Sequence, residues 1–486
     1  MKLQLTKMLA LLLAGLMTLS ATSCARGDHP DNTDETKDTS STAAVTEDET
    51  GYKPDIEVTD YNSEFVVAGV HNIMTWILPK EDSTGDPLQD SIHERNIKIK
   101  DHLGVTIQTA DAGDWRNYAS TVLRTVRAGE DAYQMVASHC YMGVPSLMTS
   151  NAVCDFAELD SVNLDAPYWS RDFMDSLTVQ GKYLVGYNDM CMAEAFCWAF
   201  NKDLMAVYNL TAPYADVTNN VWTLDKLMSL ASNVVADNGD NVWGPEDTYG
   251  MIGRGWEEVI SMASACDLRF VDRDENDVYT IALENNSEKT LKSIQMLCDM
   301  YNGQYAYFAP PEEVARVPRA GKSFADGTAL FTTTSSNVSG FRNLEFPFGV
   351  VPMPKFDEAQ KEYRSLNWNG MMFVPVSVQN KDMVSDTLEM LAYYTAPVKT
   401  AYLEDLLGTK LADAPEDAEM LDIIWNSVVS DVGLIMAENK NINTILHLVP
   451  TLCIEGSINR FGSTMQQNTK AANKALSQML DAASRN

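Results

Sequence analysis

The residues best placed to bind a small molecule are aromatic side chains that follow predicted strands. The chain has nine Trp and 19 Tyr among its 486 residues. Trp76 begins a long polar loop after the predicted strand 64–70, and His139 and Tyr141 stand at the end of the predicted strand 133–139. Aromatic rings stack on the apolar face of a sugar ring, while carboxylates, amides and Arg hydrogen-bond its hydroxyls. We therefore expect Trp76, His139 and Tyr141 to contact a ligand. Core packing is the alternative for His139 and Tyr141.

Two other tryptophans are expected to be structural. Trp222 stands at the start of a predicted helix, 221–237, and Trp425 lies in the apolar helical segment MLDIIWNSVV. Core packing explains an indole inside an amphipathic helix. Thr223 is the expected N-cap of the helix 221–237, because it precedes the apolar repeat.

The segments that must position the ligand contacts alternate between strand and helix. Apolar, β-rich runs predict strands at 64–70, 105–110 and 133–139, and the intervening segments 91–104 and 117–129 predict helices that each end at a glycine. This alternation is typical of an α/β protein built from βαβ units around a mostly parallel sheet. Ligands lie at the carboxyl ends of such strands. The loops after the three strands are therefore expected to face the ligand.

Three later segments complete the prediction of secondary structure. A strand is predicted at 181–187, and a strand that runs into a helix at 193–204. Asp272, Asp274 and Asn276 imitate the start of a calcium loop, but the sixth position lacks Gly and the twelfth lacks Glu. The segment 270–281 is therefore predicted to be a surface hairpin.

Charge and cysteine usage exclude several classes of partner. The chain carries 36 Lys and Arg against 68 Asp and Glu, a formal net charge of -32 that repels nucleic acid. Seven cysteines besides Cys24 are irregularly spaced and form neither a C-x-x-C motif nor a Cys/His zinc pattern. We expect no cofactor and no metal. The seven cysteines leave open whether one or two disulfides form.

The N-terminus has the pattern of an export signal. Lys2 and Lys7 precede an apolar run from Met8 to Leu19, and small residues then lead to Cys24. This predicts a lipoprotein signal peptide over residues 1–23 and a lipid anchor on Cys24. The alternative is an ordinary signal peptide in which Cys24 is incidental.

The segment that follows the anchor is polar and acidic. Residues 24–57 are predicted to be a disordered linker, because 25–50 contain no aromatic residue and too few apolar side chains to offset the entropy of ordering. The alternative is an acidic tail that binds a partner.

Several segments, in order, resemble the bacterial extracellular solute-binding lipoproteins of sugar ABC transporters, the broad family that includes maltose-binding protein. The resemblance covers about residues 58 to 400 and is loose over the C-terminal 80 residues. The segments that carry it are ERNIKIKDHLGVTI, GEDAYQMVAS, PYWSRDF, GKYLVGY, WAFNKDL, VWTLDKL, SFADGTALFTTTSS and FPFGVVPMPKFDEAQKEYRSLNWNGMMFVPVSVQNK.

The resemblance implies a two-lobed fold with a ligand cleft between the lobes. Each lobe is expected to be a mixed, mostly parallel sheet flanked by helices. By analogy the first lobe comprises 58–168 and 368–407, and the second comprises 169–367 and 408–486. The chain is expected to cross between the lobes three times. The crossings are placed near Trp169, Trp368 and Leu407.

The resemblance also implies further ligand contacts. Glu194 occupies the position where sugar-binding relatives place an acidic contact, shortly before the pair Asn201 and Lys202. Arg254 and Trp256 stand in a glycine-flanked segment where relatives have a binding loop.

Two last positions complete the predicted site. Ser335 belongs to a polar run, FTTTSSN, that replaces an aromatic residue of some maltodextrin binders, which argues against a long stacked platform. Trp368 and Asn369 stand at a predicted crossing, where either ligand contact or hinge packing explains them.

The expected function is capture of a sugar or oligosaccharide for an ABC transporter permease by a monomeric protein, lipid-anchored on the extracytoplasmic face of the cell membrane. One alternative is a sensor that docks on a membrane receptor, which would share the fold. Another is a secreted glycosidase that uses two carboxylates. The sequence lacks the catalytic motifs G-x-S-x-G and H-E-x-x-H, a phosphate loop and G-x-G-x-x-G. The segment G-K-S-F-A at 321–325 differs from G-x-S-x-G because its last residue is Ala and not Gly. We therefore expect a binding protein rather than an enzyme.

Overall fold

The first sheet contains the strands expected at the start of the folded chain. In the computed structural model its order is β12-β3-β1-β2, in which β1 pairs in parallel with β2 and β3. Only β12 runs antiparallel, against β3. The strands are β1 Ser63–Gly69, β2 Val105–Asp111, β3 Met135–His139 and β12 Gly370–Phe373. The late strand β12 thus joins a sheet made by the first third of the chain.

The second sheet also contains one reversed strand. Its order is β10-β4-β9-β5-β8, and β5 pairs in parallel with β8 and β9. Because β4 runs antiparallel to both of its neighbours, β10 and β9, half of the pairings in this sheet are antiparallel. The strands are β4 Phe196–Asn201, β5 Tyr249–Gly253, β8 Ala306–Phe308, β9 Ala329–Ser335 and β10 Phe348–Pro352.

Two small sheets accompany the large ones. β6 (Val271–Arg273) and β7 (Tyr279–Ile281) form the hairpin predicted for 270–281. β11 (Ser365–Leu366) pairs in parallel with β13 (Val428–Val429).

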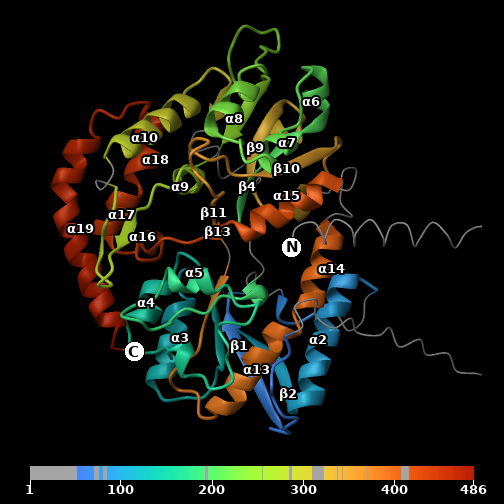
Figure 1. Ribbon diagram of the computed structural model, residues 1–486, viewed down its shortest axis with the longest axis vertical. Helices are drawn as coiled ribbons and strands as arrows, with labels where there is room; N and C mark the ends of the chain where they lie inside the picture. The colour runs from blue at the N-terminus through green and yellow to red at the C-terminus, as the bar shows by residue number, and fades with distance from the viewer. Residues whose placement is uncertain are drawn as a thin grey trace, which may run out of the picture. The chain divides into compact units, whose positions relative to one another are not determined.

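Helices pack beside the strands of the first sheet (Figure 1). α2 contacts β2 and lies against α13 and α14, and α3 contacts α4. These helices are α2 Pro87–Leu103, α3 Tyr118–Arg127, α4 Val144–Met148, α13 Lys381–Tyr393 and α14 Ala396–Leu406.

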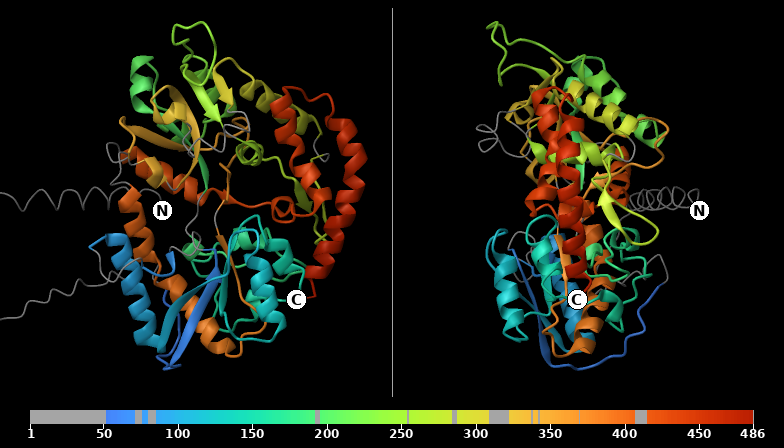
Figure 2. Two further views of the ribbon diagram at one scale, coloured as in Figure 1. Left: turned by 180° about the vertical axis from the view of Figure 1, so that it is seen from behind. Right: turned by 90° about the vertical axis from the view of Figure 1, so that its left-hand side faces the viewer.

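The C-terminal part of the chain is helical. α17 packs on α19, and α10 packs on α18, so the last helices lie beside an earlier one (Figures 1 and 2). The helices that follow α14 are α15 Pro415–Asn426, α16 Val432–Ile435, α17 Lys440–Leu446, α18 Leu448–Glu455 and α19 Phe461–Ala483. The middle of the chain contributes α5 Arg171–Asp175, α6 Lys202–Val207, α7 Tyr214–Thr218, α8 Leu224–Ala231, α9 Trp256–Ala265, α10 Ser287–Tyr301 and α12 Lys322–Ala325.

Capping explains where α2 begins and ends. The Asp86 side chain accepts hydrogen bonds from the backbone N of Leu88 and Gln89, at 3.0 and 3.2 Å. Gly104 ends the helix with φ of 64°, and a Cβ at this position would lie 2.1 Å from Asp60 Oδ1. Glycine is required there for both conformation and space.

Two predicted elements are corrected by the structure. The segment 181–187 is not a strand, because it makes only isolated bridges, such as Gly186 with Met372. The helix predicted over 221–237 is only α8, which ends at Ala231, and Thr223 stands at its N-cap without a side-chain hydrogen bond.

The buried carboxylate of Glu389, on α13, binds the Trp169 side chain. Trp169 is the residue near which the first crossing is predicted. Glu389 of α13 accepts hydrogen bonds from Trp169 Nε1 at 2.9 Å, from the Tyr168 hydroxyl, and from Asn163 N at 3.2 Å. Burial raises the pKa of Glu389. Three donors to one carboxylate compensate part of the cost of burying it.

The structure describes part of the chain, all of it within the compact unit Thr50–Asn486. Cys24 and the predicted leader lie outside it. Among the described residues, no helix is both long and apolar enough to span a membrane. The described residues are 52–70, 76–79, 85–191, 195–253, 255–283, 287–308, 322–336, 338–341, 343–368, 370–406 and 415–485.

Candidate ligand-binding site

Five aromatic side chains from distant parts of the sequence meet in one place, which we call the aromatic cluster: His139, Tyr141, Phe196, Trp256 and Trp368. The Trp368 ring is its centre. Its centroid lies 5.4 Å from Phe196, 5.9 Å from both His139 and Trp256, and 6.3 Å from Tyr141, on which it stacks. Four of the five were predicted as ligand contacts, and the fold brings those four together.

The ends of strands from both large sheets position the cluster. His139 is the last residue of β3 and pairs with Gly370 of β12, so Trp368, two residues earlier, lies beside it. Phe196 is the first residue of β4, and Trp256 is the first of α9, shortly after β5 ends. Since α/β sheets bind ligands at the carboxyl ends of their parallel strands, the cluster occupies the expected position.

Hydrogen bonds fix the loop that carries Tyr141. His139 Nδ1 accepts from Tyr141 N at 3.0 Å, so a neutral imidazole carries its proton on Nε2. The Tyr141 hydroxyl accepts from Asn443 Nδ2 at 3.2 Å, and Glu438 Oε1 accepts from Gly143 N at 2.9 Å. Burial, with Glu438 nearby, raises the pKa of Tyr141, so its hydroxyl stays neutral.

A cavity of about 110 Å³ opens beside Trp368. One wall is anchored by Glu258, which is 2% exposed and accepts hydrogen bonds from Thr333 Oγ1 at 2.6 Å and from the Tyr301 hydroxyl at 3.4 Å. Glu257 on the same helix is half-buried. The cavity is lined by Phe196, Glu257, Glu258, Thr333, Thr334, Ser335 and Trp368. Aromatic faces beside carboxylate and hydroxyl oxygens suit a ligand with apolar ring faces and several hydroxyl groups.

The other predicted contacts have different outcomes. Ser335 lines the cavity. Trp76 lies elsewhere: its ring packs on Tyr402, with centroids 4.6 Å apart, and its carbonyl accepts a hydrogen bond from Arg95 Nη2 at 2.7 Å. Glu194, Arg254 and Asn369 lie outside the described residues.

The two tryptophans expected to be structural differ from each other. Trp222 is fully buried and donates to Pro352 O at 2.9 Å, as expected of a core residue. Trp425 is only half-buried: it stacks on Tyr402, donates to Ser336 Oγ at 3.3 Å, and lines a separate cavity of about 390 Å³. The prediction of a core Trp425 is therefore wrong in part, because one face of its helix borders this cavity.

Sequence reasoning missed several residues of the site. Phe196, Glu257, Glu258 and Thr333 were not singled out, although Glu257 and Glu258 directly follow Trp256. His447 also packs on Trp256, with ring centroids 4.4 Å apart, and burial lowers its pKa. The adjacent carboxylates after Trp256 were the one available signal.

Comparison with known proteins gives structural matches only. No protein-family model and no curated protein matches the chain. A cyclic α-maltosyl-1,6-maltose binding protein from Arthrobacter globiformis has a TM-score of 0.57 at 12% identity, over 85% of this chain and 99% of that one. UgpB from Mycobacterium tuberculosis, in complex with glycerophosphocholine, has a TM-score of 0.54 at 15% identity, over 86% and 98%. A Rhizobium etli sugar transporter in an open conformation has a TM-score of 0.52 at 14% identity, over 87% and 99%.

The chain has the two-lobed α/β fold of these solute-binding proteins. The match covers 98–99% of the length of each of these three proteins. At this identity the likeness concerns the fold. One of the three holds glycerophosphocholine rather than a sugar, so the ligand must be argued from the site.

Proposed function

We propose that this protein captures a sugar or oligosaccharide and delivers it to an ABC transporter permease. The observation that carries the proposal is the aromatic cluster, with its cavity of about 110 Å³ lined by hydroxyl and carboxylate side chains. An indole or phenol ring stacks on the apolar face of a pyranose, and Glu, Thr and Ser oxygens hydrogen-bond its hydroxyls. The cluster lies where strands of both sheets end, which is the expected place for such a ligand.

The size of this cavity favours one sugar ring as the central contact. Its lining includes Phe196, Thr333, Ser335 and Trp368. A longer ligand would extend past Tyr141 and Trp256, whose rings are half-buried. Glu194, Arg254 and Asn369 are further proposed contacts, on the sequence argument alone.

Two lobes are proposed to hold this site between them, with boundaries at 58–168 plus 368–407 and at 169–367 plus 408–486. Support comes from which strands share a sheet. β12 lies in the same sheet as β1, β2 and β3, whereas β4, β5, β8, β9 and β10 form the other large sheet and β6 and β7 form the hairpin. Three crossings near Trp169, Trp368 and Leu407 are part of this proposal.

The proposed location is the extracytoplasmic face of the cell membrane. Residues 1–23 are proposed to be a cleaved signal and Cys24 a lipid anchor, followed by an acidic linker over 24–57. Two acyl chains give stable attachment, whereas one is marginal. The protein is proposed to act as a monomer and not as an enzyme.

A thermal-shift screen of mono- and oligosaccharides tests the function. A ligand at about 100 times its Kd stabilises the folded state by roughly 2.7 kcal/mol. We expect at least one sugar to raise Tm and to be recovered unchanged. Cleavage of the sugar would instead support a glycosidase, and a panel without any stabilising sugar would contradict the proposal.

A further inference from the structure

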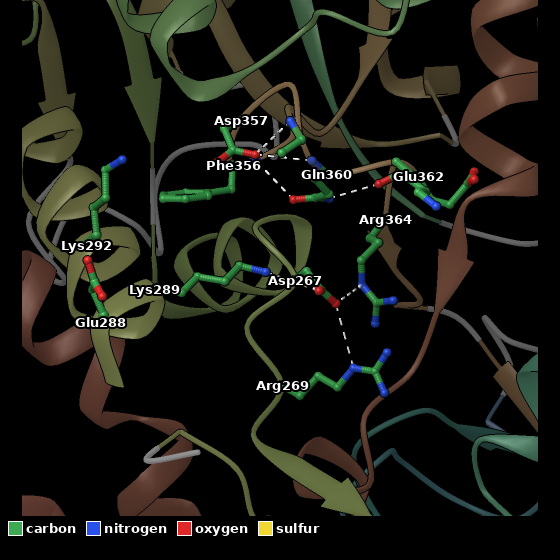
Figure 3. A pocket seen from close by; sticks show the side chains of 12 residues that line it. Asp267, Arg269, Glu288, Lys289, Lys292, Phe356, Asp357, Gln360, Glu362 and Arg364 are labelled. Atoms are coloured by element: carbon green, nitrogen blue, oxygen red, sulfur yellow. Dashed lines mark hydrogen bonds and ion pairs between the residues drawn. The ribbon is translucent and has the colours of Figure 1, made fainter. Parts of the chain in front are cut away.

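A second cavity, of about 660 Å³, is lined by Asp267 and Arg269, which follow the C-terminal end of α9, whereas Trp256 begins this helix. Figure 3 shows the side chains that line it. Its lining contains more basic than acidic side chains, five against four, although the whole chain has a net charge of -32. The basic residues are Arg269, Lys289, Lys292, Lys361 and Arg364, and the acidic ones are Asp267, Glu288, Asp357 and Glu362. Positive charge is therefore concentrated here against the trend of the molecule.

Three of these cations share one carboxylate. Lys289 Nζ lies 3.2 Å from Asp267 Oδ2, and the Nε atoms of Arg364 and Arg269 lie 3.6 and 3.7 Å from Asp267 Oδ1 (Figure 3). These four side chains carry a net charge of +2, and the lining as a whole carries +1. Asp431 lies near Arg364, but its carboxylate already accepts from backbone N atoms, among them that of Phe270 at 2.8 Å.

One arginine N–H donor in this cluster has no hydrogen-bond acceptor within the described part of the protein. Arg364 Nε is buried and makes no hydrogen bond, because 3.6 Å from Asp267 is too long for one. The guanidinium groups of Arg269 and Arg364 lie next to each other (Figure 3). Like charges at close range repel each other, and the Asp267 carboxylate, 3.7 and 3.6 Å from the Nε atoms of Arg269 and Arg364, offsets only one of the two charges. The same two arginines also line a neighbouring cavity of about 450 Å³.

We propose that this cavity binds a small oxyanion of the phosphate class, held by Arg269, Arg364 and Lys289. The planar guanidinium donates two parallel N–H bonds to a phosphate, and lysine adds a point charge. The site is distinct from the aromatic cluster, because the ten residues of α9 separate Trp256 from this end and span about 15 Å. The proposal does not depend on a sugar in the first site.

Calorimetric titration of the wild-type protein with inorganic phosphate at low ionic strength tests the site. We expect saturable binding that Arg364→Gln weakens by about tenfold or more, as loss of a charged hydrogen bond does. Arg269→Gln should weaken it in the same direction, and this half-exposed side chain can be replaced without disturbing the core. Arg460→Gln is the matched control, since it removes an exposed arginine that pairs with Glu455 elsewhere; it should leave phosphate affinity within about twofold.

A second arm distinguishes the source of the phosphate. Vesicles that contain phosphatidylglycerol replace free phosphate in a sedimentation assay with the same variants. Variant-sensitive binding of free phosphate alone assigns a soluble phosphate or phosphate ester, and variant-sensitive binding of vesicles assigns a lipid headgroup. The proposal is overturned if neither probe binds, or if Arg269→Gln and Arg364→Gln, with melting curves that show them folded, bind as the wild type does.

Discussion

Replacement of Trp256 by Ala should separate ligand binding from stability. The Trp256 ring is half-buried and contacts Tyr141, Trp368 and His447 at centroid distances of 5.6, 5.9 and 4.4 Å. Loss of an aromatic anchor costs about 2 kcal/mol or more of binding, which is roughly a 30-fold rise in Kd. Aromatic pairs contribute about 0.5–1.5 kcal/mol each. The variant should therefore also lose about 2 kcal/mol of folding stability and still be folded at room temperature.

Trp222→Ala is the matched control for the same change in the core. Trp222 is fully buried and its Nε1 donates to Pro352 O. Its removal should cost about 3–5 kcal/mol of stability and leave the affinity of the folded fraction near that of wild type. Calorimetric titration with a verified ligand, beside urea unfolding of both variants, distinguishes the two effects. If Trp256→Ala binds within twofold of wild type, Trp256 is not a ligand contact and the prediction is wrong.

Three further predictions concern the anchor, the mechanism and pH. Cys24→Ala should move the protein from the membrane to the soluble fraction with unchanged ligand affinity; retention at wild-type levels would contradict the lipid anchor. A saturating ligand should reduce the radius of gyration in small-angle scattering, because a ligand that bridges two lobes favours their closed arrangement; a tight ligand that leaves the scattering curve unchanged would contradict closure. Burial raises the pKa of Asp431 from 3.8 to about 6, so the folded state binds the proton more tightly and stability falls as pH rises from about 4 to 7. Relative to Asp431→Asn, urea unfolding should show a fall of roughly 3 kcal/mol over this range, and parallel curves would show that the pKa is not shifted.

Local sequence patterns predict much of the fold, because the periodicity of apolar residues identifies the first strands and helices and a glycine follows the end of each of these helices. β1, α2, β2, α3 and β3 appear where alternation and the Gly104 stop place them. The prediction of a strand at 181–187 is wrong because this segment has no continuous partner strand. Most of its apolar residues are buried, and buried segments and paired strands favour the same apolar residues. Gly186 there lies against Phe156, where a Cβ would come within 2.4 Å of the ring. Neither that contact nor the absent partner can be read from neighbouring residues.

The candidate site depends on pairings between distant segments. His139 and Tyr141 could be named because they follow a predicted strand, Trp256 because it matches a relative's binding loop, and Trp368 because it stands at a predicted crossing. Their meeting depends on β12 pairing with β3, which brings residue 370 opposite His139. Such long-range register is not encoded in a local pattern.

The residues that were missed depend on the same kind of information. Phe196 lies in the site because it pairs with Ser335 across β4 and β9. Glu258 and Thr333 meet through a helix and a strand that are 75 residues apart in the chain. Apart from the position of the two glutamates directly after Trp256, the sequence gave no reason to choose these residues, because runs of threonine and pairs of glutamate also occur on solvated surfaces.

The most direct test of the account is titration of the wild-type protein with a broad panel of sugars, beside glycerophosphocholine, the ligand of one structural neighbour. The account predicts that a sugar binds with one site per chain, and that Trp256→Ala and Trp368→Ala both weaken it. Binding of glycerophosphocholine without binding of any sugar, or sugar binding that neither variant weakens, would contradict the central claim that the aromatic cluster is a sugar site.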